Sequence, residues 1–268
     1  MAKTDLKARS TAIARSALPE TQSPAPHTNT PDLSTAAGRN TALMEPVLSM
    51  ADAAPPTRKR DSAATRARIL AAARDAFAHE GFAGARVERI ASASGTNVQM
   101  IYRYFGNKDG LYRAVLEATY RHVRTLEQGL DLTATPPLEA IERLVCFTFD
   151  YMRETPEFVA IIRNENMAGA AFARDMPEIQ SAGRELLTAL DDVMTRGVAS
   201  GVFTSRLPAV DLYLTILALC ITHVAQRETL SVLFGQDLGD PEWLATRRDQ
   251  VVDMVTGLLT SARPPARA

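Results

Sequence analysis

The segment spanning residues 65–116 constrains the fold of this chain most, because it alternates short amphipathic patterns with turn-forming residues. Ile69 and Phe77 fall on one face of a first helix, which then reaches Gly81, a residue that can take the positive φ of a helix C-terminus. A second glycine, Gly95, suits the tight turn between two crossed helices. The segment therefore predicts three short helices followed by a fourth.

The third of these helices is predicted to run from Val98 to Phe105. Asn97 precedes it as an N-cap, since its side-chain oxygen can accept from the open backbone N–H groups of the first turn. Ile101 and Phe105 are four residues apart and face inward, which leaves polar side chains on the outer face. Such a face suits the major groove of DNA, where Gln pairs with adenine, Arg with guanine or phosphate, and Tyr hydroxyls with phosphate.

At these residues the chain closely resembles the TetR family of one-component transcriptional regulators. In that family a glycine-aromatic pair ends the first helix, and a Tyr-x-Tyr/His-Phe signature ends the recognition helix. Two positions depart from the pattern: Arg86 stands where a capping Thr or Ser is usual, and Thr96 where Val is usual. We expect Arg86 to replace the hydroxyl contact to phosphate with a charge-assisted one. The matching residues are Gly81-Phe82, Ile90-Ala91, Gly95, Tyr102-Arg103-Tyr104-Phe105, Lys108-Asp109 and Leu111.

The candidate DNA contacts come partly from the outer face of this helix and partly from the resemblance. Gln99 and Met100 have no evident packing role, so we expect them to contact bases or sugars. The resemblance implies that Tyr104 reaches a phosphate and that Lys108 contacts the DNA backbone. The alternatives are a core position for Tyr102 and a solvated charge for Lys108. The full set is Arg86, Asn97, Val98, Gln99, Met100, Tyr102, Arg103, Tyr104 and Lys108.

The net charge of −1 hides an asymmetry between the two halves of the chain. Residues 1–122 carry 17 Lys and Arg against 11 Asp and Glu, whereas residues 123–268 carry 13 against 20. Because phosphate contacts supply much of the affinity for DNA, the basic half is the one expected to bind it. The first 60 residues contain no aromatic residue and seven of the 15 prolines, too little apolar surface to offset ordering.

We therefore expect three regions in the chain. Residues 1–60 form a disordered basic tail, 61–125 the DNA-binding domain, and 126–268 a ligand-sensing and dimerisation domain. Beyond residue 111 the sequence shows helical patterns without strand-like alternation, which predicts about five more helices. The predicted fold class is all-α, with an N-terminal three-helix helix-turn-helix domain and a larger C-terminal helical bundle.

The longest apolar run, from Leu212 to Ala225, is shorter than the roughly 20 residues that a membrane span needs. We interpret it as a helix buried on nearly all sides, which for a member of this family implies burial by the core and by a subunit interface, and we expect no membrane association. The resemblance implies that two long helices, about 209–234 and 241–261, pair with their mates in a dimer. Packing within one chain would produce the same periodicity. A near-heptad seam on the last helix comprises Leu244, Val251, Val255 and Leu258.

A small-molecule pocket is implied by the resemblance rather than by any motif. Its candidates are polar or aromatic residues embedded in apolar helical stretches. For each of them a satisfied core or surface position is the competing interpretation, and the run from Arg163 to Asn166 has an internal helix cap as its alternative. The candidates are Phe147, Tyr151, Phe158, Arg163, Asn166 and His223.

The sequence does not predict an enzyme. Its four histidines are scattered, neither Cys146 nor Cys220 has metal-ligand spacing with them, and no phosphate-binding glycine loop occurs. We expect no metal and no cofactor. The predicted function is a cytoplasmic, homodimeric repressor that binds a palindromic operator in double-stranded DNA and is released by a small-molecule effector.

An architectural or protein-binding helix-turn-helix module is the alternative, because Val98 and Met100 cannot form hydrogen bonds with bases. The identity of the effector, the operator sequence and the target genes are not predicted, nor is the choice between Met1, Met44 and Met50 as the start.

Overall fold

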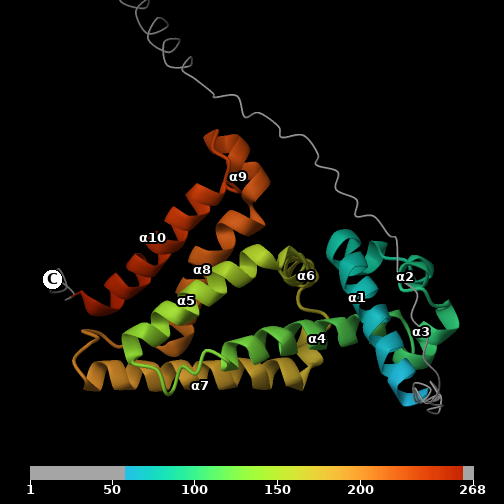
Figure 1. The fold of residues 1–268 in the computed structure, drawn as a ribbon, viewed down its shortest axis with the longest axis horizontal. Coiled ribbons are helices and arrows are strands. Elements are labelled where there is room, and N and C mark those ends of the chain that lie inside the picture. Colours follow the sequence, from blue (N-terminus) through green and yellow to red (C-terminus); the bar gives the residue numbers. More distant parts are fainter. Residues whose placement is uncertain (1–57, 262–268) are drawn as a thin grey trace, which may run out of the picture. The chain divides into compact units, whose positions relative to one another are not determined.

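The computed structural model describes residues 58–261, and this part of the chain contains ten α-helices, one 3₁₀ helix and no strand (Figure 1). The all-α prediction is confirmed. The predicted tail lies outside the described residues except at its end, where α1 begins at Arg58. The elements are α1 (Arg58–Gly84), α2 (Val87–Ala93), α3 (Val98–Phe105), α4 (Lys108–Gln128), α5 (Pro137–Glu154), α6 (Pro156–Met167), η1 (Ala173–Asp175), α7 (Pro177–Ala199), α8 (Ala209–Ala225), α9 (Arg227–Phe234) and α10 (Pro241–Thr260).

The first core lies among α1, α2, α3 and the start of α4. Gly81 has φ 68° and ψ 176°, which interrupts α1 as the sequence predicts, and Gly95 has φ 65° in the turn before α3. Phe82 then folds back, so that its ring lies 5.2 Å from that of Tyr112. Ile161 of α6 is also fully buried in this core, so the C-terminal half contributes to the packing of the N-terminal half.

The second core lies in the C-terminal bundle, where α5, α7, α8 and α10 pack together. Leu144, Leu190, Ile216 and Val255 are each completely buried there. The longer α4 belongs to both halves: its N-terminal part enters the first core, and its C-terminal part packs against α7 (Figure 1). It is the helix that continues from the DNA-binding half into the bundle.

The course of the last helices differs from the prediction. The predicted long helix 209–234 is broken at Gln226, and α8 and α9 meet at a bend of 74°. Within one chain the core covers only part of α8, because Leu214 in its apolar run is 58% exposed. Among the helices of residues 58–261, none alone is long and apolar enough to cross a bilayer; α8 and α9 meet that measure only as a bent pair.

The predicted seam of α10 is wrong for two of its four residues. Val251 and Val255 are completely buried in the core of their own chain, and Leu244 packs partly against it. Only Leu258 stays open, with 46% of its surface exposed. Most of the near-heptad residues lie on the face of α10 that packs against the bundle of its own chain. Packing within a chain and packing between subunits produce the same apolar period, so the spacing cannot distinguish them.

Candidate DNA-binding surface and effector cavities

Two residues that the sequence predicts as anchors, an N-cap and a buried side chain, fix the position of helix α3. The Oδ1 atom of Asn97 accepts from the backbone N–H of Met100 at 2.9 Å, and Ile101 is completely buried. Gln99 and Arg103 are exposed on the outer face, together with Tyr102, which is 45% exposed. The core alternative for Tyr102 is therefore wrong.

Three candidate residues on α3 are half-buried. Val98 and Tyr104 pack partly against the first core, and Met100 lies between core and surface. The Tyr104 hydroxyl lies 3.0 Å from the Oγ atom of Ser62 on α1, which fixes the direction of the ring. A hydroxyl has both a donor and two acceptor positions, so this bond leaves further capacity for a phosphate oxygen.

Lys108 is half-exposed and contacts its own chain. Its Nζ atom lies 4.9 Å from the ring centroid of Phe82 and donates to the carbonyl oxygen of Ala83 at 3.4 Å. These contacts tie the start of α4 to the turn after Gly81, a role that the sequence gave no sign of.

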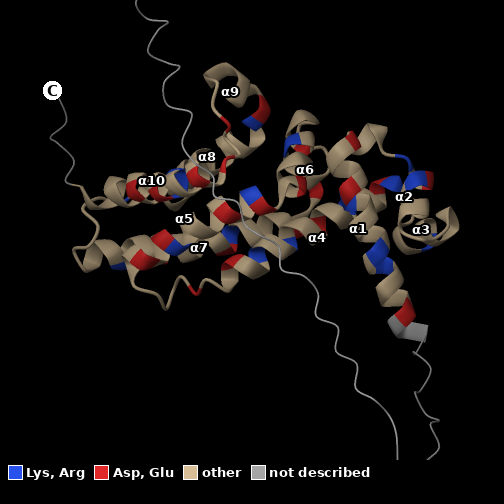
Figure 2. Ribbon diagram, turned by 45° about the horizontal axis from the view of Figure 1, so that its top comes forward, with Lys and Arg blue, Asp and Glu red and all other residues tan. Residues whose placement is uncertain are grey.

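Arg86 occupies the N-cap position of α2 without a side-chain capping bond. Its guanidinium is exposed and makes no ion pair or hydrogen bond with the rest of residues 58–261. Nearby, the Nε atom of Arg68 donates to the carbonyl oxygen of Ser94 at 3.3 Å and so ties α1 to the turn before α3. Figure 2 shows basic residues on α1 and α2, close to α3.

The run from Arg163 to Asn166 on α6 links the two halves of the molecule. The Nδ2 atom of Asn164 donates to the carbonyl oxygens of Phe77 and Ala78, at 3.1 and 3.4 Å, in the last turn of α1 before Gly81. Asn164 thus supplies donors to the open end of a helix in the other half, rather than capping a helix within its own.

The neighbouring carboxylate of Glu165 is 4% exposed and accepts three hydrogen bonds. One comes from the Tyr112 hydroxyl of α4 at 3.1 Å. The other two come from the backbone N–H groups of Phe172 and Ala173 at the start of η1, at 2.7 and 2.9 Å. Burial, with the carboxylate of Glu165 acting in the same direction, raises the pKa of Tyr112, so its hydroxyl remains a donor.

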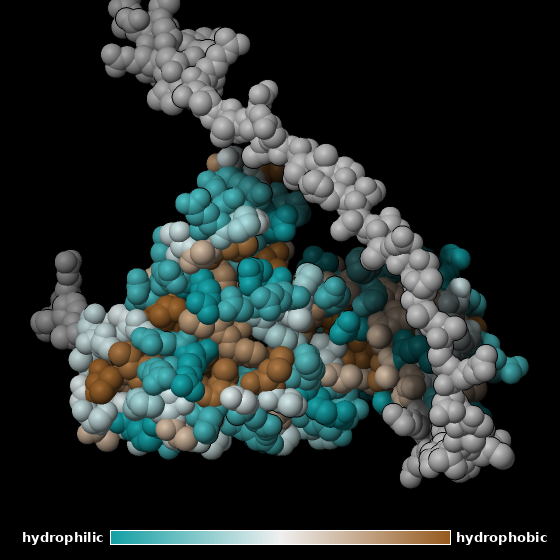
Figure 3. Space-filling model, viewed as in Figure 1, coloured by the Kyte–Doolittle hydropathy of each residue, from teal (hydrophilic) through white to brown (hydrophobic). Residues whose placement is uncertain are grey.

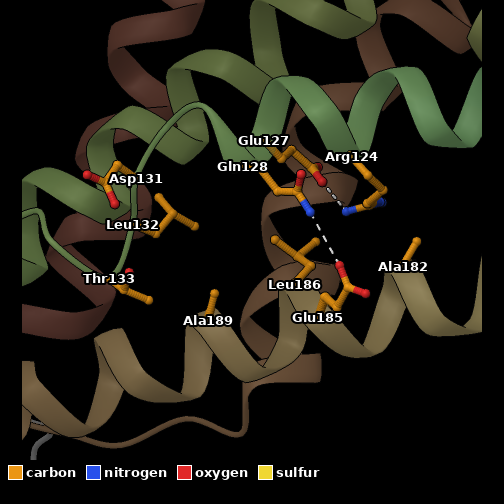
Figure 4. A pocket seen from close by; sticks show the side chains of 10 residues that line it. All are labelled: Arg124, Glu127, Gln128, Asp131, Leu132, Thr133, Ala182, Glu185, Leu186 and Ala189. Atoms are coloured by element: carbon orange, nitrogen blue, oxygen red, sulfur yellow. Dashed lines mark hydrogen bonds and ion pairs between the residues drawn. The ribbon is translucent and has the colours of Figure 1, made fainter.

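A first cavity, of about 200 Å³, lies between α4 and α7 (Figure 4). Arg124 and Glu127 form a largely buried ion pair on its wall, and the Tyr213 hydroxyl lies 3.3 Å from the Arg124 guanidinium and 3.4 Å from the Glu127 carboxylate. Burial, with the carboxylate of Glu127, raises the pKa of Tyr213 to about 12. The only basic residue of this lining, Arg124, is already paired, and no candidate from the sequence lies on this wall.

A second cavity, of about 330 Å³, lies between α1, α4 and the start of α6. Tyr151 and Phe158 line it, and their ring centroids are 5.2 Å apart in an edge-on arrangement. Phe147 stacks on Tyr151 at 5.6 Å but does not line the cavity. The three predicted aromatic residues thus form one cluster, two of whose members reach a cavity.

A third cavity, of about 580 Å³, lies between the end of α5, α6, the end of α8, α9 and the start of α10. Arg163 and His223, both predicted ligand contacts, line it, whereas Asn166 does not. Asn166 is exposed, and its Nδ2 atom donates to the carbonyl oxygen of Ile162 at 3.0 Å, so the structure does not bring it to this cavity. Arg153 and Arg227 also line this cavity, although no pattern in the sequence distinguishes them from other surface arginines.

His223 is 5% exposed, and neither of its ring nitrogens has a hydrogen-bond partner within residues 58–261. Its ring stacks on Phe149 at 4.5 Å and meets the edge of Trp243 at 5.9 Å. Burial, with the nearby positive charge of Arg247 acting in the same direction, lowers the pKa of His223 to about 4. His223 is therefore buried, but it is not the hydrogen-bonded core histidine of the competing interpretation.

Comparison with known proteins agrees with both halves of this architecture. A model described as bacterial regulatory proteins, tetR family, matches residues 69–115, and one described as tetracyclin repressor-like, C-terminal domain, matches residues 137–255. The transcriptional repressor NicS of Pseudomonas putida is 36% identical over 178 residues, which cover 66% of this chain and 84% of NicS. The chain belongs to the TetR family of transcriptional regulators.

Other relatives support this assignment. The transcriptional repressor SCO4008 of Streptomyces coelicolor is 34% identical over 179 residues, covering 66% of this chain and 86% of that protein. A crystal structure of the transcriptional regulator SCO4942 of Streptomyces coelicolor superposes with a TM-score of 0.56 at 25% identity, covering 73% of this chain and 98% of that one. The chain is thus a helix-turn-helix DNA-binding regulator of a non-enzymatic family, as the sequence predicts.

Proposed function

We propose that this TetR-family regulator is a cytoplasmic repressor that binds a palindromic operator as a homodimer and is released from it by a small molecule. The observation that carries the proposal is the outer face of α3, where Gln99, Tyr102 and Arg103 are exposed on a helix anchored by Asn97 and Ile101. Two relatives, NicS and SCO4008, are themselves named as repressors, which supports repression over activation.

The contacts to DNA divide by chemistry. Gln99 and Arg103 read base edges in the major groove, and the apolar side chains of Val98 and Met100 contact sugars or thymine methyl groups. Phosphate contacts position the helix and come from residues around it. These are Arg86, Asn97, Tyr102, Tyr104 and Lys108.

Two substitutions separate sequence reading from phosphate binding. Gln99→Ala should change which base pairs are preferred, because each mismatched pair costs about 1–3 kcal/mol only where a side chain reads it. Tyr104→Phe should weaken binding to all sequences alike. Fluorescence anisotropy with the operator and single-mismatch duplexes measures both effects. If neither variant changes affinity or preference, α3 is not the recognition helix.

The homodimer is supported by an open apolar stripe on the last two long helices. Val210 and Leu214 of α8 are 48% and 58% exposed, and Met254 and Leu258 of α10 are 44% and 46% exposed. On the face seen in Figure 3, hydrophobic residues reach the surface over the C-terminal helices. A patch of this kind on a monomer is a typical association surface.

Sedimentation velocity tests the dimer directly. Leu214→Asp should convert the protein to a monomer and abolish tight operator binding, because it places a charge in the proposed interface. Leu126→Asp is the matched control, since Leu126 is a 40% exposed leucine on α4 and does not belong to the stripe. If Leu214→Asp and the control both sediment as dimers, the stripe is not the interface.

Release from DNA follows as a population shift. A ligand that fits only the conformation with the wrong spacing between the two recognition helices lowers operator affinity by its differential affinity for the two states. The elements that can transmit the change are α4, which belongs to both cores, and α6, whose Asn164 and Glu165 bind the DNA-binding half.

A further inference from the structure

The cavity between α5, α6, α8, α9 and α10 differs from the other two in its charge. Arg153, Arg163 and Arg227 line it, against a single acid, Glu228. This concentration of positive charge lies in the half of the chain where acidic residues outnumber basic ones by seven. A local excess of one sign against the trend of the domain indicates an oppositely charged partner.

The three arginines differ in how far acidic residues already neutralise their charge. Arg153 forms an ion pair with Glu154 at 2.6 Å, and Arg227 lies 3.6 Å from the exposed carboxylate of Glu228. Arg163 makes no ion pair and no side-chain hydrogen bond with any part of residues 58–261. By contrast, the buried Arg124 beside the α4–α7 cavity is already neutralised by Glu127.

His223 is the second, independent observation at this cavity. Its ring nitrogens are buried and lack any partner among the described residues, a costly arrangement unless another group completes it. A neutral imidazole has one donor and one acceptor, so it can bind a carboxylate or a polar substituent. Since the nitrogens are covered, a ligand reaches them only when the surrounding side chains move.

The rest of the lining suits an apolar body. Pro156, Val224, Leu238 and Leu244 line the same cavity, whose volume of about 580 Å³ is that of a small-molecule site. Guanidinium groups bind planar carboxylates through paired hydrogen bonds. The ligand class that matches this lining is a small organic acid with an apolar framework.

We propose that this cavity is the effector site of the repressor and binds a small organic carboxylate, with Arg163 and Arg227 at the carboxylate and His223 at a polar group. This inference rests on the proposed function. Binding here also has a short route to the DNA-binding half, because Asn164, the residue after Arg163, donates to the carbonyl oxygens of Phe77 and Ala78 in α1.

The test uses the full-length protein with benzoate as the probe and benzamide as its neutral counterpart. Long-range ¹H–¹⁵N spectra report the His223 imidazole signals during titration at pH 7. Benzoate should shift them saturably with a millimolar dissociation constant, and benzamide should bind at least about tenfold more weakly. Arg163→Gln and Arg227→Gln should each weaken benzoate binding at least about tenfold. Arg184→Gln, at an exposed arginine of α7 that does not line the cavity, should leave it unchanged.

Three results would overturn the inference: no shift of the His223 signals at about 20 mM benzoate, equal binding of benzamide, or equal losses in Arg163→Gln and Arg184→Gln. Operator binding without benzoate, measured on the same samples, tests the proposed function separately. If benzoate fails but the protein still binds one palindrome selectively, only the effector site is wrong. If operator binding is also absent, the proposed function fails with it.

Discussion

Acidification from about pH 7 to about pH 5 should destabilise this protein through one residue, His223, by about 2 kcal/mol. Burial and the charge of Arg247 lower the pKa of this imidazole from 6.5 to about 4. The unfolded chain therefore takes up a proton as the pH falls through 6.5, while the folded protein resists protonation until the pH approaches 4. The contribution of the neutral ring to the free energy of unfolding is fully present above the pKa of the unfolded state. It is lost as the pH falls towards the pKa of the folded state.

The size of the effect follows from this difference in pKa. Each unit corresponds to about 1.4 kcal/mol, so the whole shift corresponds to about 3 kcal/mol, of which about 2 kcal/mol is lost by pH 5. Carboxylates also titrate in this range, so the measurement must isolate the histidine. His223→Leu removes the titrating ring and leaves every acid in place.

Urea unfolding of both proteins at a series of pH values gives the difference in their free energies of unfolding. The wild-type protein should lose about 2 kcal/mol more than His223→Leu between about pH 7 and about pH 5. Parallel pH profiles for the two proteins would refute the argument, because they would mean that His223 is protonated as readily in the folded state as in the unfolded one.

Two further substitutions test the packing that supports the site. Glu165→Ala should destabilise the protein by about 2–5 kcal/mol in urea unfolding, since it leaves the Tyr112 hydroxyl and two backbone N–H groups without an acceptor. Glu165→Gln keeps an acceptor and should cost clearly less; equal losses would contradict this account. Gly197→Ala should cost about 1–3 kcal/mol because its Cβ would lie 2.0 Å from the buried ring of Phe203. Adding Phe203→Leu should recover part of that loss, and a neutral Gly197→Ala would show that the ring is free to move.

The recognition helix could be predicted closely because its signals are local. An asparagine before the helix, a buried isoleucine one turn in, and a glycine with positive φ in the preceding turn each act within a few residues. The observed bounds, Val98 to Phe105, are those predicted.

The packing of the last helices could not be predicted in the same way. The spacing of Val251 and Val255 identifies an apolar face but not the helix that covers it, and the structure places both in the core of their own chain. The break at Gln226 lacks the proline or glycine that usually marks the end of a helix.

The polar links of the C-terminal half join residues far apart in sequence. Arg124 reaches Tyr213, 89 residues away, and Asn164 reaches Phe77, 87 residues away. No periodicity or motif reports such pairs. His223 was named as a candidate from its apolar surroundings, but that its ring nitrogens lack a partner became visible only in three dimensions.

In-vitro selection from random duplex DNA by the full-length protein tests the central claim most directly, at about 0.15 M salt so that non-specific phosphate binding is weakened. We predict a palindromic consensus whose half-sites are about ten base pairs apart, as two recognition helices in successive major grooves require. A single half-site would contradict the dimer. Salt-sensitive binding without any consensus would contradict sequence-specific regulation and favour the architectural module instead.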